Sequence, residues 1–88
     1  VLIYHENKGQ NVTFEGCELN ASAGVEGKAA IEIDSSLLKN ENKYTIEING
    51  TTATGFANGN VSGNPLWNQK KGQKSTITID GVKVAEAV

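Results

Sequence analysis

Apolar and polar residues alternate with a period of two in four short segments of this chain. The segments are 12–15, 31–33, 45–48 and 76–79, and in each of them valine, isoleucine or phenylalanine occupies every second position. Because successive side chains of a β-strand point to opposite faces, this alternation predicts four strands with one buried face each. The apolar run 1–4 predicts a further strand. No segment shows sustained helical periodicity, so we expect an all-β chain.

Three of these strands run into the same local motif. Segments 12–19, 46–53 and 77–84 each contain an apolar-polar-apolar triplet, an acidic or amide residue, a glycine, and then a second strand-like stretch. The glycines lie 34 and 31 positions apart. Regular spacing of one structural unit is typical of stacked repeats. Across each glycine, the positions that face inward also change from even to odd residue numbers or the reverse. A straight strand would keep one or the other, so the backbone must turn or bulge there.

Two architectures explain these turns. Asn-Gly and Asp-Gly between alternating strands are strong signals for two-residue hairpins, which would build an antiparallel β-sandwich. Alternatively, one residue of left-handed conformation swings the chain around the corner of a parallel solenoid. Hairpins would bring Ile48 close to Thr51, whereas a solenoid would stack Ile46 on Ile77.

The spacing favours the solenoid, because strand-like segments 29–33 and 65–67 follow the first two glycines at the same distance. Residues 12–19 read V-T-F-E-G-C-E-L, which resembles the coil motif of right-handed parallel β-helix proteins, the pectate-lyase-like superfamily. The resemblance implies a short right-handed parallel β-helix segment, as in bacterial surface and adhesin-like proteins. Two departures stand out. Glycine replaces the family's asparagine at the corner, and the repeat is longer than the family's compact coils, so the loops must bulge outward. The chain also has no arginine, the residue that the family's lyases use in catalysis, which argues against lyase activity.

Composition narrows the class of protein. We expect residues 1–88 to form a single β domain, a fragment of a longer secreted chain. A net charge of −2 argues against a nucleic-acid partner, and no apolar run is long enough for membrane insertion. The single cysteine excludes an internal disulfide, and one cysteine with one histidine cannot complete a structural zinc site.

Trp67, Asn68 and Gln69 are the candidate ligand-binding residues. An exposed indole could stack on a sugar ring while the neighbouring amides bond to its hydroxyl groups. The competing interpretation is structural. Leu66 and Trp67 occupy the positions of Ala30 and Ile31 one repeat earlier, so one of the two is expected to be buried.

Carboxylates on or beside the strands suggest a calcium-binding face as an alternative. If the repeats stack in register, Glu15, Asn49 and Asp80 fall into one column. The plainer interpretation is that these are corner residues chosen for their backbone preference. Apart from calcium in this alternative, we expect no cofactor. The acidic residues concerned are Glu15, Glu18, Glu32, Asp34, Glu47 and Asp80.

No catalytic constellation is recognisable. His5 and Glu6 are adjacent, but neighbours on a strand point to opposite faces. Cys17 is expected on the inward face as an inert apolar residue. We therefore assign no catalytic residue. Four sequons begin at Asn11, Asn20, Asn49 and Asn60, which would be glycosylated only in a eukaryotic secreted protein.

The sequence thus predicts a non-enzymatic structural or adhesive module, extracellular or on the cell surface. Its expected partners are glycans, or another protein chain paired to exposed coil edges. Two other functions stay open: a partial polysaccharide-lyase-like domain with a calcium-binding acidic face, and a small immunoglobulin-like binding domain if the hairpins are real.

Overall fold

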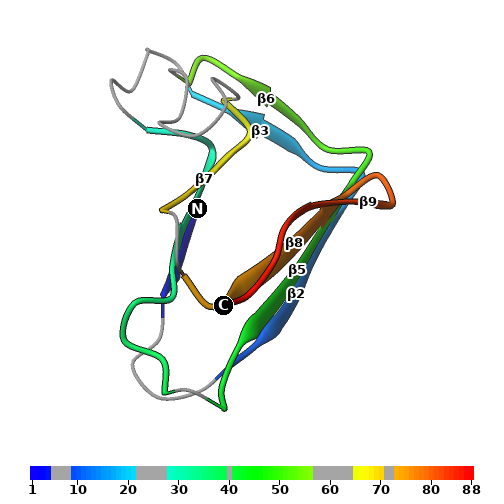
Figure 1. The fold of residues 1–88 in the computed structure, drawn as a ribbon. Coiled ribbons are helices and arrows are strands. Elements are labelled where there is room, and N and C mark those ends of the chain that lie inside the picture. Colours follow the sequence, from blue (N-terminus) through cyan, green and yellow to red (C-terminus); the bar gives the residue numbers. More distant parts are fainter. Residues whose placement is uncertain (5–8, 22–27, 40, 57–64, 71–72) are drawn as a thin grey trace.

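The computed structural model describes the chain apart from residues 5–8, 22–27, 40, 57–64 and 71–72 (Figure 1). Every regular element among the described residues is a β-strand, which confirms the all-β class. The strands form three sheets, called here sheet A (three strands), sheet B (four strands) and sheet C (two strands).

Sheet A contains β1 (Leu2–Tyr4), β4 (Ile31–Asp34) and β7 (Trp67–Gln69), in that order and all parallel. Sheet C consists of the parallel pair β3 (Glu18–Asn20) and β6 (Thr52–Thr54).

Sheet B contains β2 (Asn11–Glu15), β5 (Tyr44–Asn49), β8 (Ser75–Ile79) and β9 (Val82–Ala85). The first three strands are parallel, and β9 is antiparallel to β8. An antiparallel sandwich built from hairpins is therefore wrong for this chain, because five of the six strand pairs described are parallel.

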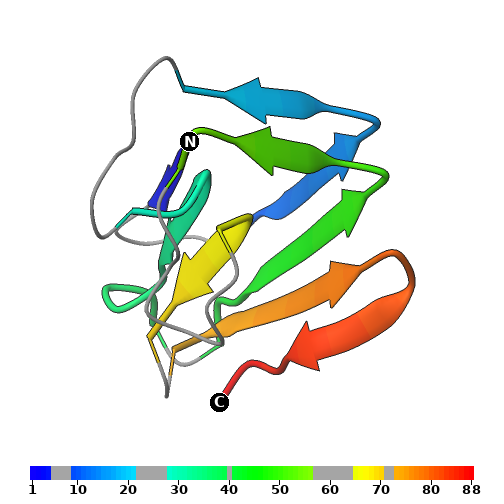
Figure 2. The same cartoon turned by 90° about the horizontal axis from the view of Figure 1, so that it is seen from above.

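The chain visits the sheets in a fixed order (Figure 2). It passes through A, B and C as β1, β2 and β3, repeats the circuit as β4, β5 and β6, and then adds β7 and β8. Each strand lies on its counterpart from the circuit before. The expected stacking of Ile46 on Ile77 is confirmed by the register of β5 and β8.

The three glycine motifs give two different turns. Gly16 and Gly50 have φ angles of 61° and 54°, and each carries the chain around the corner from sheet B to sheet C. At the third motif both Asp80 (φ 48°) and Gly81 (φ 83°) are left-handed, which is the requirement of a type I′ hairpin turn. The chain therefore reverses there, and β9 folds back on β8.

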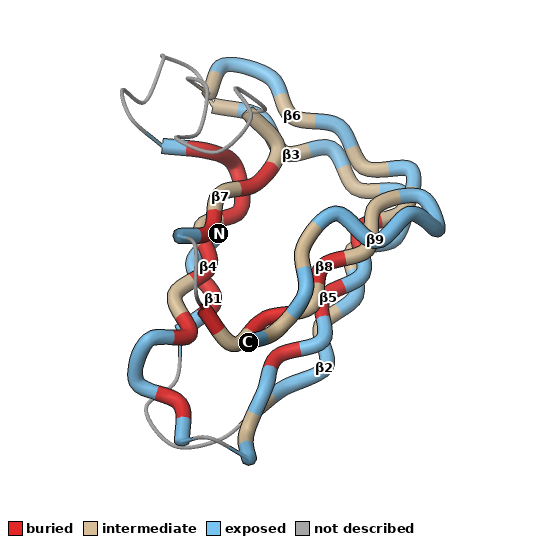
Figure 3. Tube along the Cα trace, viewed as in Figure 1, coloured by how far each residue is buried: buried red, intermediate tan, exposed pale blue. Residues whose placement is uncertain are grey.

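Buried residues lie along the strands of sheets A and B (Figure 3). Register places the inward residues of successive circuits in columns. One column runs Val12, Ile46, Ile77, and a second runs Phe14, Ile48, Ile79. The middle circuit is the best covered, since Ile46 and Ile48 are 0% and 1% exposed.

Buried polar residues occupy the corner where the chain passes from sheet A to sheet B. Gln73 Oε1 accepts hydrogen bonds from Ser35 N–H (3.0 Å) and Ser35 Oγ (3.2 Å). Ser75 Oγ donates to Ser35 Oγ at 3.0 Å. Gln69 Nε2 donates to Ser75 carbonyl oxygen at 3.4 Å, while Gln69 Oε1 is buried without a partner among the described residues.

Candidate functional site

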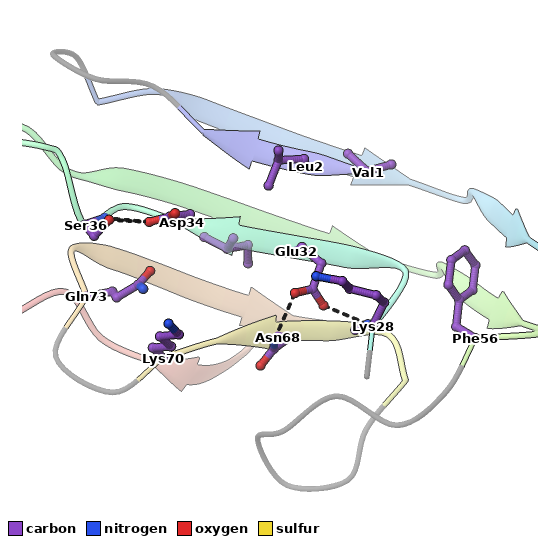
Figure 4. A pocket seen from close by; sticks show the side chains of 12 residues that line it. Val1, Leu2, Lys28, Glu32, Asp34, Ser36, Phe56, Asn68, Lys70 and Gln73 are labelled. Atoms are coloured by element: carbon purple, nitrogen blue, oxygen red, sulfur yellow. Dashed lines mark hydrogen bonds between the residues drawn. The ribbon is translucent and has the colours of Figure 1, made fainter. Parts of the chain in front are cut away.

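A pocket of about 540 Å³ lies on the outer face of sheet A (Figure 4). Its floor consists of the outward-facing residues of neighbouring strands, because alternate residues of β4 and β7 point away from the core. The register places Glu32 beside Leu2 on one side and beside Asn68 on the other. Residues from three circuits of the chain thus meet in one row.

Glu32 is fixed in position by two hydrogen bonds. Its Oε2 accepts from the Ala29 N–H at 2.7 Å, and its Oε1 accepts from Asn68 Nδ2 at 3.0 Å. Asn68 Oδ1 is buried and has no hydrogen-bond partner among the described residues. The pair therefore forms a preorganised group of acceptors, of which the amide oxygen is unused.

Asp34 lies at one end of the pocket, two residues further along β4. Its Oδ1 accepts hydrogen bonds from Ser36 Oγ (2.6 Å) and Ser36 N–H (3.0 Å). These bonds, together with the nearby positive charge of Lys70, hold the pKa of Asp34 below its ordinary value, against a small opposing effect of burial. Asp34 is consequently a carboxylate at neutral pH.

Phe56 stands at the opposite end of the pocket (Figure 4). Its ring is half-buried, and the exposed apolar residues Val1 and Leu2 also line the pocket. Lys28 and Lys70 add one cation each to the lining. The side chains of the lining thus contribute two carboxylates and two ammonium groups, which balance in charge.

The three predicted ligand-binding residues are divided between the two faces of β7. Trp67 is 5% exposed and Gln69 is 7% exposed, and Trp67 belongs to the core cluster. The prediction that the Trp67 indole stacks on a sugar is therefore wrong, and the structural interpretation holds: Trp67 pairs with Ile31 and shares its inward orientation. Only Asn68 reaches the outer pocket.

The predicted column is present only in part, because the register pairs Glu15 with Asn49 but ends at Ile48 and Ile79, before Asp80. Asn49 Nδ2 donates to Glu15 Oε2 at 3.2 Å, and Asp80 Oδ1 accepts from the Gly50 N–H at 2.8 Å. Within the described part of the chain, no three histidine, cysteine, aspartate or glutamate side chains gather as metal ligands would. The geometry therefore lends no support to a calcium-binding face.

Two further candidates from the sequence lie away from the pocket or outside the described part of the chain. His5 and Glu6 lie outside the described residues. Cys17 is half-buried rather than buried, and its thiol donates a hydrogen bond of 3.6 Å to the Glu15 carbonyl oxygen.

Comparison with known proteins gives no match: no protein-family model, curated protein or solved structure matches this chain. Among the residues with described positions, no helix has the length and apolar character needed to cross a bilayer.

The sequence did not predict that the pocket residues come together, and the available signal differs between them. Asp34, which was considered only for a calcium-binding face, and Lys70 alternate with core positions. Stacking the outward positions of aligned repeats would have brought them together with Glu32 and Asn68. Phe56 and Lys28 lie outside the strands, where no periodicity marks a position as lining a pocket.

Proposed function

We propose that this chain is a short right-handed parallel β-helix segment, an extracellular non-enzymatic module whose sheet A binds a neutral saccharide in the outer pocket. The five parallel strand pairs and the repeated A-B-C circuit support the β-helix assignment. The observation that carries the binding proposal is the preorganised Glu32–Asn68 pair on the floor of the pocket.

The chemistry of the lining favours hydroxyl groups as ligands. The Glu32 and Asp34 carboxylates are acceptors, while the Lys28 and Lys70 ammonium groups are donors. A sugar hydroxyl both donates and accepts, so it can use both kinds of group. The balance of charge favours a neutral sugar over an acidic one.

Phe56 supplies the apolar contact that a sugar ring needs. Aromatic faces offer a large rigid surface, and pockets of this kind combine such a surface with a few polar groups that fix orientation. Phe56 thus takes the role that the sequence suggested for Trp67.

The proposal is tested by screening the protein on an array of neutral and acidic oligosaccharides, with Asn68→Ala as the variant. Asn49→Ala is a matched control, because Asn49 also donates its Nδ2 to a glutamate of the preceding circuit but lies outside the pocket. We expect selective binding of neutral sugars that falls at least tenfold in Asn68→Ala and in Phe56→Ala, and that persists in Asn49→Ala. Absence of binding to every sugar, or equal losses in Asn68→Ala and Asn49→Ala, would overturn the proposal.

A further inference from the structure

Asn49 is the one side-chain amide among the three corner motifs, since the equivalent residues are Glu15 and Asp80. Asparagine is a thermolabile residue, because the following backbone nitrogen can displace its side-chain amide. A following glycine presents no Cβ that would hinder this attack. Asn49 is half-buried and Gly50 is exposed, so the peptide lies within reach of solvent. The corner therefore has the local chemistry of a deamidation site.

The fold holds the two reacting groups toward different circuits of the chain. β5 lies between β2 and β8 in sheet B. The Asn49 side chain is turned toward β2, where its Nδ2 donates to Glu15 Oε2 at 3.2 Å. The Gly50 N–H is turned the other way, toward the end of β8, where it donates to Asp80 Oδ1 at 2.8 Å. Attack of the Gly50 nitrogen on the Asn49 side chain requires both contacts to open.

The contact with Asp80 also opposes the chemistry of the reaction. The Gly50 nitrogen must lose its proton before it can attack. The Asp80 carboxylate stabilises the protonated nitrogen by accepting its hydrogen bond, and its negative charge disfavours the anion that deprotonation would create. The same carboxylate thus fixes the geometry and suppresses the reactive form.

The backbone around the corner is bonded to both neighbouring circuits as well. Asn49 carbonyl oxygen accepts from Gly16 N–H at 2.8 Å, and Ile48 carbonyl oxygen accepts from Asp80 N–H at 2.9 Å. A corner held from both sides reacts only when it opens locally, and the free energy of that opening sets the rate.

We propose that Asn49 is a site of spontaneous deamidation that Glu15 and Asp80 hold in check. When the corner opens, the Gly50 nitrogen loses its proton and bonds to Asn49 Cγ. The bond from Cγ to Nδ2 breaks, and Nδ2 takes up a proton and leaves as ammonia. Water then opens the resulting succinimide at either of its carbonyl carbons, which leaves aspartate or isoaspartate at position 49.

The reaction would weaken the stacking of β5 on β2. The register sets position 49 directly opposite Glu15. A carboxylate at position 49 has no proton to donate, so the present hydrogen bond becomes a contact between like charges, which is destabilising across neighbouring strands. Isoaspartate in addition lengthens the backbone just before Gly50, whose φ of 54° turns the corner. Deamidation therefore loosens the same contacts that delay it.

Peptide mapping by mass spectrometry during storage at neutral pH measures the conversion and separates it from Asn58-Gly59, the other Asn-Gly of the sequence. We expect Asn49 to convert at least tenfold more slowly in the folded protein than in urea. Asp80→Gly removes the acceptor of the Gly50 N–H and leaves a Gly-Gly turn, which suits a type I′ hairpin. We expect it to convert at least threefold faster in the folded state. Glu15→Ala, which releases the Asn49 side chain, is expected to act in the same direction.

A destabilised control variant separates the two contacts from global unfolding. Gln73→Leu loses buried hydrogen bonds to Ser35 but leaves the partners of Asn49 and Gly50 in place. We expect its conversion rate at Asn49 to equal that of the original protein, with urea denaturation measuring the stability of each variant. Three results are incompatible with the proposal: equal rates in folded and unfolded protein, slower conversion in Asp80→Gly, or the same acceleration in Gln73→Leu.

Asn49→Asp tests the effect of the conversion on the fold. We expect a lower urea midpoint, whereas Asn20→Asp, which adds the same charge at an exposed strand position opposite Thr54, should leave the midpoint unchanged. Adding Glu15→Gln to Asn49→Asp restores an amide opposite a carboxylate and should recover most of the loss. An unchanged midpoint in Asn49→Asp, or no recovery in the double variant, would overturn the inference that deamidation loosens the stack.

Discussion

At the scale of single residues, the backbone conformation beside each glycine decides the path of the chain. Glu15-Gly16, Asn49-Gly50 and Asp80-Gly81 share a motif, yet only Asp80 adopts a positive φ before its glycine. Local chemistry does not separate the second motif from the third, because Asn-Gly and Asp-Gly are both strong hairpin signals. The sequence identified where the chain turns but not which turn reverses it, since β6 finds a parallel partner in β3 whereas β9 pairs with β8.

Gly50 offers a test of this conformational requirement. A Cβ at Gly50 would meet only ordinary contacts, the nearest being Gly16 Cα at 3.9 Å, so substitution introduces backbone strain alone. We expect Gly50→Ala to lower the free energy of unfolding by about 1–2 kcal/mol. Gly50→Asn should lower it less, because asparagine tolerates the left-handed region. Urea denaturation measures both, and a larger loss for asparagine than for alanine would contradict the expectation.

Asp34 gives a pH-dependent prediction. Its folded-state pKa lies below that of the unfolded chain, so the carboxylate stabilises the fold above the ordinary aspartate pKa of about 3.9, and this contribution disappears as the pH falls through the lowered value. Ser36→Ala should raise the pKa of Asp34 and reduce stability at pH 7, but not at acidic pH where Asp34 is protonated. Carboxyl NMR titration measures the shift, and Ser36→Thr, which keeps the hydroxyl, is the control. An unchanged pKa in Ser36→Ala would refute this account.

At the scale of strands, period-two alternation proved the most informative part of the sequence. It placed β2, β4, β5 and β8, and the equal spacing of the repeats aligned Trp67 with Ile31. It did not say whether Leu66 or Trp67 points inward, because alternation fixes relative orientation within a strand and not its phase. For that reason two of the three candidate residues, Trp67 and Gln69, point into the core, and Asn68 alone faces the outer pocket.

Gln69 and Gln73 both lie in the buried polar corner, but they differ in how well their side-chain oxygens are hydrogen-bonded. Gln69→Leu removes a buried oxygen that has no partner among the described residues, together with one long hydrogen bond of 3.4 Å. We expect its stability to be unchanged or increased.

Gln73→Leu is the contrasting substitution in the same corner. It removes the acceptor for both Ser35 groups and should cost about 1–3 kcal/mol, since a buried donor is left unsatisfied. Thermal unfolding of the two variants compares them directly, and a greater loss for Gln69→Leu would contradict this ranking.

At the scale of the whole molecule, the fold depends on contacts between distant residues. The five parallel pairs join residues about 30 positions apart or more, as in the pairing of Leu2 with Glu32, and β8 with β9 is the one local pair among the described strands. Closing such long loops costs conformational entropy before any contact compensates for it.

Refolding should accordingly be slow for a chain of 88 residues. We expect a rate in the range of milliseconds to seconds, as for other proteins with mostly non-local pairing. Trp67 is a built-in reporter, because the only tryptophan of the chain is buried in the core. Stopped-flow fluorescence after dilution from urea measures the rate, and completion within microseconds would be inconsistent with this topology.

The reversal at Asp80-Gly81 also changes how sheet B can be extended. In a regular solenoid, the next circuit would place a parallel strand directly on β8. Here β9 returns along β8 and occupies that position in the antiparallel direction. One pair of left-handed residues thus prevents a further parallel strand from pairing with β8.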